Sequence, residues 1–356
     1  MSDPLAVRPP CSVMLAKPLG STVPAGAFLY EPKWDGFRCV VFRGADSVVL
    51  QSRSEEDIAY AFPEVVAAAL SLQPGTVLDG ELAVLADGRV DFGILQQRLR
   101  PRSEAGGNID RLAGHFPATF IAFDLIGLPG RDVRDLPVRD RRALLTQVEL
   151  PASFHLTPAT TDHATAERWF VDVIGAGLDG LIAKPLDGHY RPGVRALGKV
   201  KPSHTADVVV AAWRPHKTPG ADGRAEVGSL VLGVYDDQGH LHHVGSASSF
   251  SAKARAELTD ELEPLALTDA EHPWVDAPGG VRVPDTPNRW RRGADRDLVL
   301  LRPERVAEVK YDGLTDGRFR HVARLLRWRP DRRADSCSFD QFPQPDPLAV
   351  DELLTW

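Results

Sequence analysis

Residues 31–38 read EPKWDGFR and place Lys33 two positions before an Asp-Gly turn. Segments rich in β-branched and aromatic residues lie around it, AFLYEPKW at 27–34 and CVVF at 39–42, and predict a strand on each side of the turn. Lysine usually lies in solvent, so a lysine held between a proline and a tryptophan is unusual. A free ammonium group has a pKa of about 10.4 and is not a nucleophile. A nucleophilic Lys33 would therefore need burial or neighbouring cations that disfavour the charged form.

Segments of strand and helix character alternate outward from this turn through the first two hundred residues. Gly, Pro or Asp bounds each strand candidate, and Pro63 and Asp162 are suited to open helices. The further strand candidates are SVVLQSRS (47–54), TVLDGELAVL (76–85), FIAFDLIGL (120–128), GLIAKPL (180–186) and LGKVKP (197–202). The helix candidates are PEVVAAALSL (63–72), VRDRRALLTQVEL (138–150) and HATAERWFVDVIGAG (163–177). The alternation predicts a mixed α+β domain.

The pattern changes after Pro202 to short strands divided by turn-rich loops, with one helix at 251–265 that Ser251 can cap. Five strands and one helix suit a small β-barrel of the oligonucleotide-binding (OB) kind, with a β-sandwich as the alternative. The strand candidates are DVVVAAWRP (207–215), GSLVLGVYDD (228–237), LHHVGSASS (241–249), VAEVKYDGL (306–314) and RHVARLLRWR (320–329). We expect a first domain over residues 1–203, a barrel domain over 204–335, and a loosely held Pro-rich tail over 336–356.

Composition excludes several classes of protein. Among 356 residues, 42 Lys and Arg stand against 49 Asp and Glu, so a net charge of −7 gives no global affinity for nucleic acid. Three cysteines lie far apart, which supports neither a disulfide framework nor a cysteine zinc site. No apolar stretch is long enough to cross a membrane, and the first residues lack a secretory pattern. A cytoplasmic protein is the expectation.

Any surface that binds phosphate must then be local. Basic residues cluster at three places, and charge alone favours a solvated or salt-bridged face for each cluster. The clusters are Arg98, Arg100 and Arg102, then Arg289, Arg291 and Arg292, and last the run from Arg324 to Arg333. His240, His242 and His243 invite a metal interpretation, but beside a DDQG turn they are more typical of a hairpin face.

Pairs of charged residues two apart on predicted strands project from one face. Lys199 and Lys201 form such a pair, which is tolerable beside a polyanion such as a nucleotide phosphate, or as an exposed rim. Asp79 and Glu81 form an acidic pair that would suit a metal, a ribose contact, proton transfer or a plain polar face. Asp179 is a further acid at a strand edge. Spacing alone does not choose among these roles.

The order of these elements resembles the motifs of the covalent nucleotidyltransferases. The chain is most similar to the short, two-domain bacterial ATP-dependent DNA ligases of the actinobacterial LigC type, from about residue 8 to about residue 335. A lone KxDG is common by chance, but seven elements in order are highly specific. The elements are EPKWDGFR, QSRSE, LDGEL, FIAFD, DGLIAK, KVKP and RWRPDR.

The resemblance implies an adenylation domain followed by an OB domain, and a role for each matching residue. Lys33 would attack the α-phosphorus of ATP, expel pyrophosphate and hold AMP through a phosphoramidate bond. In the nucleotide pocket, Glu31 would meet the adenine edge, Phe123 would stack on adenine, Arg38 and Arg53 would meet ribose or nick phosphate, and Lys184 would contact the nucleotide. Glu81 and Asp179 would bind metal, and Glu81 would also contact the ribose. Lys199 and Lys201 would meet the α-phosphate. Arg329, Asp331 and Arg332 would form the end motif, which is directed at the β,γ-phosphates.

Three positions depart from the family pattern. Asp179 stands where Glu is common, Arg332 where Lys is common, and Leu197 where an aromatic residue is often found. None of these departures removes a charge that the mechanism needs, although a carboxylate one methylene shorter could bind metal through water. Because about thirty residues precede Lys33, we expect the two core domains alone to hold the substrate.

The resemblance implies ATP as cofactor, with Mg²⁺ as the metal because hard oxygen ligands and phosphate suit it, and Mn²⁺ able to replace it. The implied partner is nicked double-stranded DNA with a 3′-hydroxyl and a 5′-phosphate. We further expect a monomer in the cytoplasm, at the nucleoid. It would work in DNA repair or recombination beside a repair polymerase or other factors.

Two alternatives share parts of this pattern. An RNA ligase or an mRNA-capping guanylyltransferase would use the same lysine on another acceptor. A non-catalytic nucleic-acid-binding module would not need Lys33, Glu81, Lys199 and Lys201, all of which are intact. The RWRPDR segment and the strands AAWRP and GSLVLGVYDD resemble bacterial DNA ligases more than capping enzymes, which favours the ligase.

Overall fold

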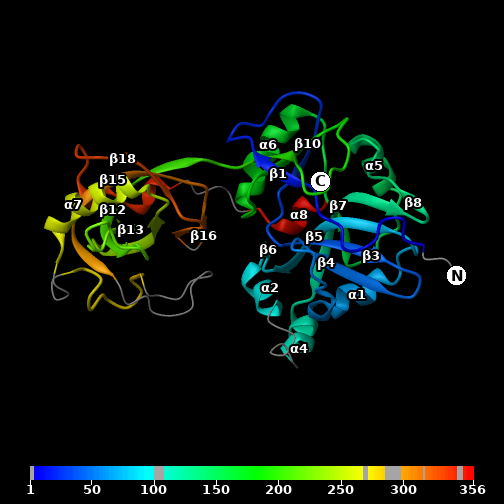
Figure 1. The fold of residues 1–356 in the computed structure, drawn as a ribbon, viewed down its shortest axis with the longest axis horizontal. Coiled ribbons are helices and arrows are strands. Elements are labelled where there is room, and N and C mark those ends of the chain that lie inside the picture. Colours follow the sequence, from blue (N-terminus) through cyan, green and yellow to red (C-terminus); the bar gives the residue numbers. More distant parts are fainter. Residues whose placement is uncertain (1–3, 100–107, 268–271, 285–297, 316, 343–347) are drawn as a thin grey trace. The chain divides into compact units, whose positions relative to one another are not determined.

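The computed structural model describes residues 4–99, 108–267, 272–284, 298–315, 317–342 and 348–356. The chain divides into two compact units (Figure 1). The first unit comprises Met1–Pro202 together with Pro345–Trp356, and the second comprises Ser203–Gln344. Within the described residues, none of the helices has the length and apolar character that crossing a membrane requires.

Two sheets build the first unit. A seven-stranded sheet runs in the order β4-β3-β5-β7-β8, with β6 paired to β5 and β9 paired to β7, and a four-stranded sheet runs β1-β11-β10-β2. In the larger sheet the strands are β3 (Phe37–Arg43), β4 (Val48–Ser52), β5 (Val77–Ala86), β6 (Arg89–Val90), β7 (Ala118–Leu128), β8 (Arg131–Asp132) and β9 (Phe154–Leu156). In the smaller sheet they are β1 (Leu15–Pro18), β2 (Phe28–Pro32), β10 (Leu181–Pro185) and β11 (Arg195–Val200).

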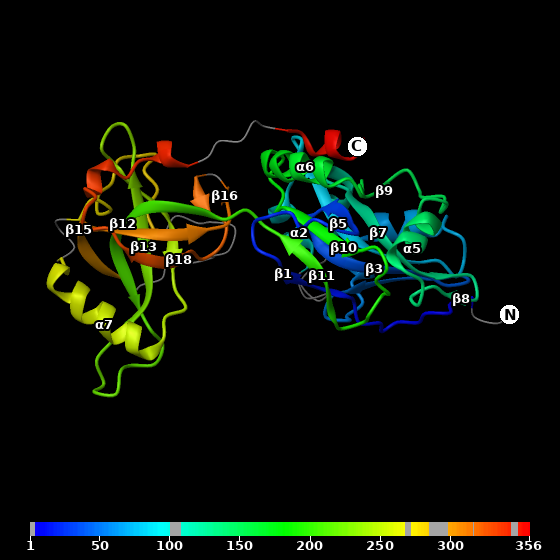
Figure 2. The same ribbon diagram turned by 90° about the horizontal axis from the view of Figure 1, so that it is seen from above.

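Helices cover these sheets (Figure 2). Asp162 caps α6 by accepting a hydrogen bond from the Thr165 amide at 2.8 Å, as the sequence predicts. Asp91 caps α2 in the same way through the Ile94 amide. The helices of this unit are α1 (Pro63–Ala69), α2 (Phe92–Arg98), α4 (Asn108–His115), α5 (Val138–Leu145), α6 (His163–Gly175) and α8 (Val350–Leu353). The sequence patterns did not identify α2 and α4, which are only seven and eight residues long.

The EPKWDGFR segment links the two sheets. Its first half ends β2 in the smaller sheet and its second half begins β3 in the larger one, so the two strands are not a hairpin. Gly36 lies where the chain crosses, and a Cβ there would stand 2.0 Å from the carbonyl oxygen of Leu82. Only glycine permits this approach. Lys33 therefore lies where the two sheets meet.

The second unit is a barrel built from an antiparallel sheet that a parallel bridge between Ala247 and Ala323 closes. Its five-stranded sheet runs β14-β13-β12-β15-β18, and the Ala323 amide donates to the Ser246 carbonyl at 2.8 Å, so the chain entering β18 meets β14 and closes the sheet. This closure confirms the barrel over the sandwich. The elements are β12 (His204–Pro215), β13 (Val227–Tyr235), β14 (Leu241–Ala247), α7 (Ala252–Leu262), β15 (Val299–Tyr311), β16 (Leu314–Thr315), β17 (Arg318–Phe319) and β18 (Arg324–Trp328). Short 3₁₀ turns lie at Ala59–Ala61, Glu263–Leu265, Ala334–Ser336 and Phe339–Gln341.

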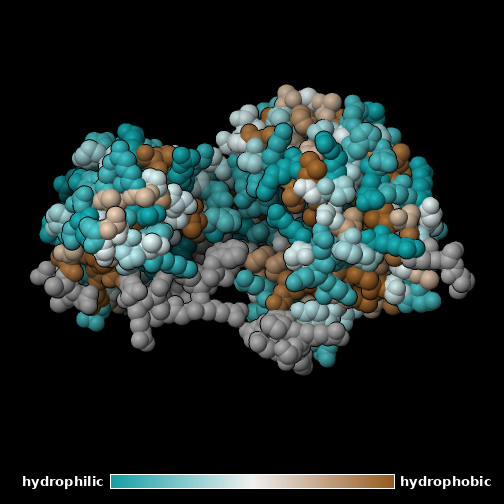
Figure 3. Space-filling view, in the orientation of Figure 1, coloured by the Kyte–Doolittle hydropathy of each residue, from teal (hydrophilic) through white to brown (hydrophobic). Residues whose placement is uncertain are grey.

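Residues 343–347, most of the Pro-rich stretch, lie outside the described residues, but the described residues on both sides of them differ from the loosely held tail that we expected. Cys337 is fully buried in the second unit, where its carbonyl accepts from the Tyr235 amide at 2.8 Å. In the first unit, α8 buries Val350 and Leu353 completely, and the Val350 amide donates to the Gly88 carbonyl. These apolar residues of the tail are buried against partners far away in the sequence. Elsewhere the visible face of each unit is mainly hydrophilic (Figure 3).

Candidate active site

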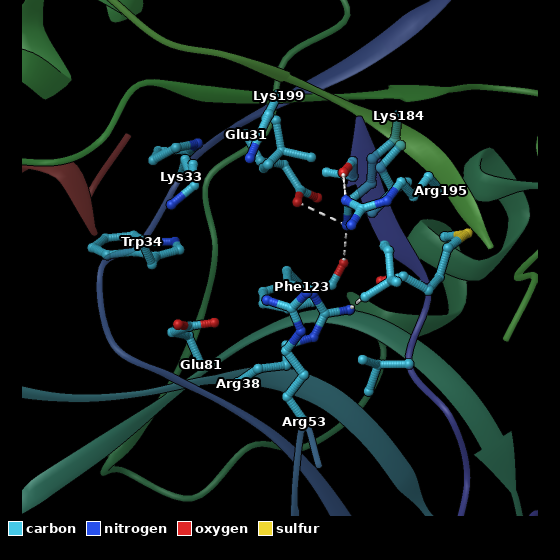
Figure 4. Close-up of a pocket in the computed structure, with 17 residues that line it drawn as sticks. Glu31, Lys33, Trp34, Arg38, Arg53, Glu81, Phe123, Lys184, Arg195 and Lys199 are labelled. Atoms are coloured by element: carbon cyan, nitrogen blue, oxygen red, sulfur yellow. Dashed lines mark hydrogen bonds and ion pairs between the residues drawn. The ribbon is translucent and has the colours of Figure 1, made fainter. Parts of the chain in front are cut away.

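A pocket lies at the segment that carries Lys33 (Figure 4). Strands of the smaller sheet supply part of its lining, and β3, β5 and β7 of the larger sheet supply another part. Cationic side chains outnumber carboxylates along it, which favours a polyanionic ligand such as a nucleotide phosphate. Its charged lining residues are Glu31, Lys33, Arg38, Arg53, Glu81, Lys184, Arg195 and Lys199.

The register of the smaller sheet places one row of pocket residues side by side. Ile182 of β10 pairs with Glu31 of β2 on one side and with Lys199 of β11 on the other. All three line the pocket, so a carboxylate, an apolar side chain and an ammonium group follow each other across the strands. Ile182 is uncharged, so the charge pattern of the sequence did not single it out. Its alternation with the buried Leu181 and Ala183 is the signal that could have identified it.

Lys33, Asp179 and Lys201 form one cluster beside the pocket. The Asp179 carboxylate lies 2.6 Å from the Lys33 Nζ atom and 3.0 Å from the Lys201 Nζ atom, and only 9% of its side chain is exposed. The Lys33 amide also donates to the Gly180 carbonyl at 2.8 Å, which ties the nucleophile candidate to the start of β10. The predicted concentration of cations around Lys33 is thus present, with a carboxylate at its centre.

Lys199 lies on the pocket face, within the electrostatic influence of the same cluster. Burial, and then the neighbouring Lys201 and Lys33 cations, lower the pKa of Lys199. Lys199 in β11 and Lys201 directly after the strand therefore crowd positive charge at this end of the pocket, where a bound phosphate would relieve their repulsion.

Glu81 presents its carboxylate to the pocket from β5. One oxygen accepts a hydrogen bond from the Gly36 amide at 3.2 Å. Burial raises the pKa of Glu81 to about 7, against the lowering effect of Arg38 and Lys33. A carboxylate in this position can accept a hydroxyl hydrogen bond or bind a hard cation.

Asp79 has a different role from Glu81, although the two lie two residues apart on β5. Its carboxylate accepts from the Nε and Nη2 atoms of Arg38 at 2.6 Å each, and from the Tyr190 hydroxyl at 2.6 Å. Asp79 is fully buried, so it is the internal counter-ion of Arg38 rather than a pocket group. The acidic pair is therefore one structural carboxylate and one pocket carboxylate.

An aromatic platform lies at the other end of the pocket. The guanidinium carbon of Arg38 lies 4.4 Å from the centre of the Phe123 ring, and the Lys184 Nζ atom lies 5.0 Å from it. Lys184 also donates to the Phe123 carbonyl at 2.5 Å and pairs with a Glu31 carboxylate oxygen at 2.8 Å. Arg53 lines the same pocket from the end of β4. These five residues lie together at this end of the pocket (Figure 4).

The end motif lies in the second unit. The Arg329 Nη1 atom lies 2.9 and 3.0 Å from the Asp207 carboxylate oxygens, and its Nη2 atom lies 2.8 Å from Asp331. Arg332 approaches the same Asp207 carboxylate at 3.5 Å. The Gln341 amide group bonds the Asp207 backbone in both directions, at 2.8 and 3.0 Å. Asp207 therefore organises both arginines, and no sequence motif had identified it.

Other candidates from the sequence behave differently. Arg98 is fully buried, paired with Glu64 and with two carbonyl groups near α4, so its predicted phosphate role is wrong. His240 and His242 both bond the Asp236 carboxylate beside the β13–β14 turn. The described part of the chain holds no cluster of three or more metal-binding side chains. The remaining predicted phosphate contacts, Arg100, Arg102, Arg289, Arg291 and Arg292, lie outside the described residues.

Sequence comparisons match both units to one family. Residues 13–201 match the ATP dependent DNA ligase domain, and residues 223–332 match the ATP dependent DNA ligase C terminal region. The chain is 47% identical to DNA ligase C2 of Mycolicibacterium smegmatis, with 96% of each chain covered. It is 44% identical to DNA ligase C of Mycobacterium tuberculosis, with 98% of each chain covered.

Structure comparison agrees on the fold. A solved Lig E DNA ligase superposes with a TM-score of 0.54 at 20% identity, covering 89% of this chain and 99% of that chain. At this identity the similarity concerns the fold alone.

Proposed function

The chain belongs to the ATP-dependent DNA ligases, and we propose that Lys33 is the nucleophile with which this ligase takes up AMP. The observation that carries the proposal is the position of its Nζ atom, at a cation-rich pocket and 2.6 Å from Asp179. Lys33 is the lysine that lies where the two sheets meet, with Lys199 and Lys201 beside it. No separate acid-base pair is needed at such a site, because phosphoryl transfer depends on alignment and charge neutralisation.

The first step follows from this arrangement. Adenine would lie between the Phe123 ring and the Ile182 side chain, which line the pocket, with its amino group toward Glu31. The unprotonated Nζ atom of Lys33 forms a bond to the α-phosphorus while the bond to pyrophosphate breaks. Lys199 and Lys201 would neutralise the charge that spreads over the α-phosphate oxygens.

The pocket acids fit a divalent cation. Asp179 and Glu81 supply two carboxylates, and Mg²⁺ is commonly held by one or two carboxylates together with water and phosphate rather than by an all-protein cage. The absence of a larger acidic cluster among the described residues agrees with this mode. Mg²⁺, or Mn²⁺ in its place, would neutralise phosphate charge. A cation at Asp179 would also compete with Lys33 for that carboxylate, which releases the lysine from its ion pair.

The later steps act on DNA. AMP would pass from Lys33 to the 5′-phosphate of a nick, and the 3′-hydroxyl would then displace AMP to form the phosphodiester bond. We propose nicked double-stranded DNA as the substrate, and a monomer working in DNA repair at the nucleoid, beside a repair polymerase or other factors. The support for this part is the family membership and the barrel, a fold suited to nucleic acid.

Covalent labelling tests the proposal. The full-length protein is incubated with α-labelled ATP or GTP, denatured and separated by electrophoresis. We expect label from ATP that is lost in Lys33→Ala and kept in Lys253→Ala, a lysine 86% exposed on α7. Label that survives in Lys33→Ala would exclude Lys33. Label from GTP in preference to ATP would favour a capping-type guanylyltransferase.

A further inference from the structure

The Glu31 carboxylate is held from several sides in the base end of the pocket. Only 2% of its side chain is exposed. Lys184 of β10 pairs with its Oε2 atom at 2.8 Å, while its Oε1 atom has no hydrogen-bond partner among the described residues. A buried carboxylate oxygen without a partner is costly, and it is available to a donor on a ligand.

Arg142 approaches this oxygen from α5. Its Nη1 atom lies 3.7 Å from Glu31 Oε1 and likewise has no hydrogen-bond partner within the described part of the chain. The other guanidinium nitrogen, Nη2, is fixed by donating to the Thr157 carbonyl at 2.7 Å. The positive charge of Arg142 is thus held near Glu31, while the Glu31 Oε1 atom stays available to a hydrogen-bond donor.

We propose that Arg142 is a positioning residue that keeps the Glu31 carboxylate ionised and aimed at the nucleotide base, and thereby sets the preference for adenine over guanine. This inference rests on the proposed function of the pocket. Adenine offers an amino donor on the ring edge where guanine offers a carbonyl acceptor. An ionised carboxylate attracts the first and repels the second.

The charges around Glu31 explain why a second cation matters. Burial is the largest effect and raises the pKa of Glu31, while Lys184 and Arg142 lower it. Asp124 of β7 also raises it, but the Asp124 carboxylate is itself paired with Arg141 at 2.7 and 2.9 Å. Without Arg142 the carboxyl group would hold its proton to higher pH. A protonated Glu31 can donate to the guanine carbonyl, so discrimination would fall, and most strongly at low pH.

The experiment measures base choice rather than activity alone. Single-turnover formation of enzyme-AMP and enzyme-GMP is followed in the full-length protein from pH 6 to 8.5, with nucleotide concentration varied. We expect Arg142→Gln to lower the ATP-to-GTP ratio of kcat/KM by on the order of tenfold, mainly through KM for ATP. The loss should be larger at pH 6 than at pH 8.5. Arg142→Lys, which keeps the charge, should restore part of the ratio.

The matched control is Arg139→Gln. Arg139 lies on the same helix, is 58% exposed and pairs with Asp187, away from Glu31. Its ATP-to-GTP ratio should equal that of the wild type. If Arg142 acts through Glu31, then Glu31→Gln should lower the ratio, and the Glu31→Gln/Arg142→Gln double variant should lower it no further.

Two results would overturn the inference. One is equal loss of ATP and GTP labelling in Arg142→Gln with an unchanged ratio, which would mean that Arg142 only supports the fold through Thr157. The other is an additive loss in the double variant. If a thermal melt shows that Arg142→Gln is unfolded, Arg142→Met keeps the long side chain without the charge and carries the same expectations. Failure of the proposed function is distinct, because the wild type would then form no Lys33-dependent enzyme-AMP at all.

Discussion

Single residues decide how the pocket receives phosphate. Lys199 lies in β11 and Lys201 directly follows the strand, and both bring positive charge to the place where Lys33 meets Asp179. Their mutual repulsion is visible in the lowered pKa of Lys199, of which burial is the first cause and Lys201 the next. A site that crowds ammonium groups in this way is prepared for a polyanion before the polyanion arrives.

We predict that Lys199→Ala and Lys201→Ala each slow enzyme-AMP formation by about 10²–10³, the usual cost of removing a group that stabilises a developing oxyanion. Rapid-quench labelling under single-turnover conditions measures the rate. Lys17→Ala is the control, because Lys17 is exposed on the neighbouring strand β1 and does not line the pocket. Near-normal rates in both lysine variants would contradict the assignment of these lysines to the α-phosphate.

Asp179 allows a second test at this scale. We expect Asp179→Asn to raise the Mg²⁺ concentration needed for half-maximal adenylation and to lower the maximal rate, because one carboxylate ligand and the ion pair with Lys33 are both lost. Asp179→Glu keeps the charge and should retain more activity than Asp179→Asn. The measurement is a Mg²⁺ titration of enzyme-AMP formation. Identical titrations in wild type and Asp179→Asn would show that the metal is held elsewhere.

The pocket residues that the sequence could predict share one property. Lys33, Glu31, Glu81 and Phe123 lie in short local motifs, where the chemistry of each position can be recognised without the fold. Arg142 could not be found in this way. It lies on a helix of ordinary amphipathic pattern, and only the packing of α5 against β7 brings it to Glu31. The same is true of Tyr190, which donates to Asp79, a residue distant in sequence.

At the scale of elements, strands with long apolar runs were predictable and short elements were not. The predicted strand 76–85 corresponds to β5, and 120–128 to β7, because the interior of the larger sheet demands apolar residues on both faces. Strand β1, four residues long, has no comparable pattern. Its place depends on parallel pairing with β11, almost two hundred residues away.

The carboxy-terminal helix α8 gives a prediction at this scale. Leu353 is fully buried in the first unit, so Leu353→Ala should lower the free energy of unfolding by about 2–5 kcal/mol. Leu326→Ala is the control, because Leu326 of β18 is 45% exposed and should change little. Chemical denaturation followed by intrinsic fluorescence suits the measurement, since Trp356 stacks on Trp169 with ring centres 4.7 Å apart. Equal stability of the two variants would mean that α8 does not stay docked in solution.

The whole molecule has its chemistry divided between two units. Lys33 and the pocket belong to the first, while Arg329, Asp331 and Arg332 belong to the second. The sequence order of the motifs could reveal this division, because a barrel pattern begins after Pro202. It could not reveal that Pro345–Trp356 returns to the first unit, since that docking depends on burial of a few apolar side chains against distant partners.

The division predicts different effects on the two halves of the reaction. The sequence resemblance directs Arg329 at the phosphates that leave as pyrophosphate, and these phosphates take part in the first step only. Arg329→Ala should therefore impair enzyme-AMP formation far more than sealing of a pre-adenylated nick. Asp207→Asn should impair the same step to a smaller degree, because Asp207 accepts two bonds from Arg329 and approaches Arg332.

Arg327→Ala is the matched control, since Arg327 lies two residues earlier, is 64% exposed and pairs with Glu308. Both half-reactions should be close to wild type in this variant. Measuring the two steps separately decides among the roles of the end motif. Equal losses in both steps for Arg329→Ala would indicate that the motif holds DNA or supports the barrel. A normal first step would show that Arg329 remains bound to Asp207 and Asp331 throughout, as a structural element of the second unit and not as a phosphate ligand.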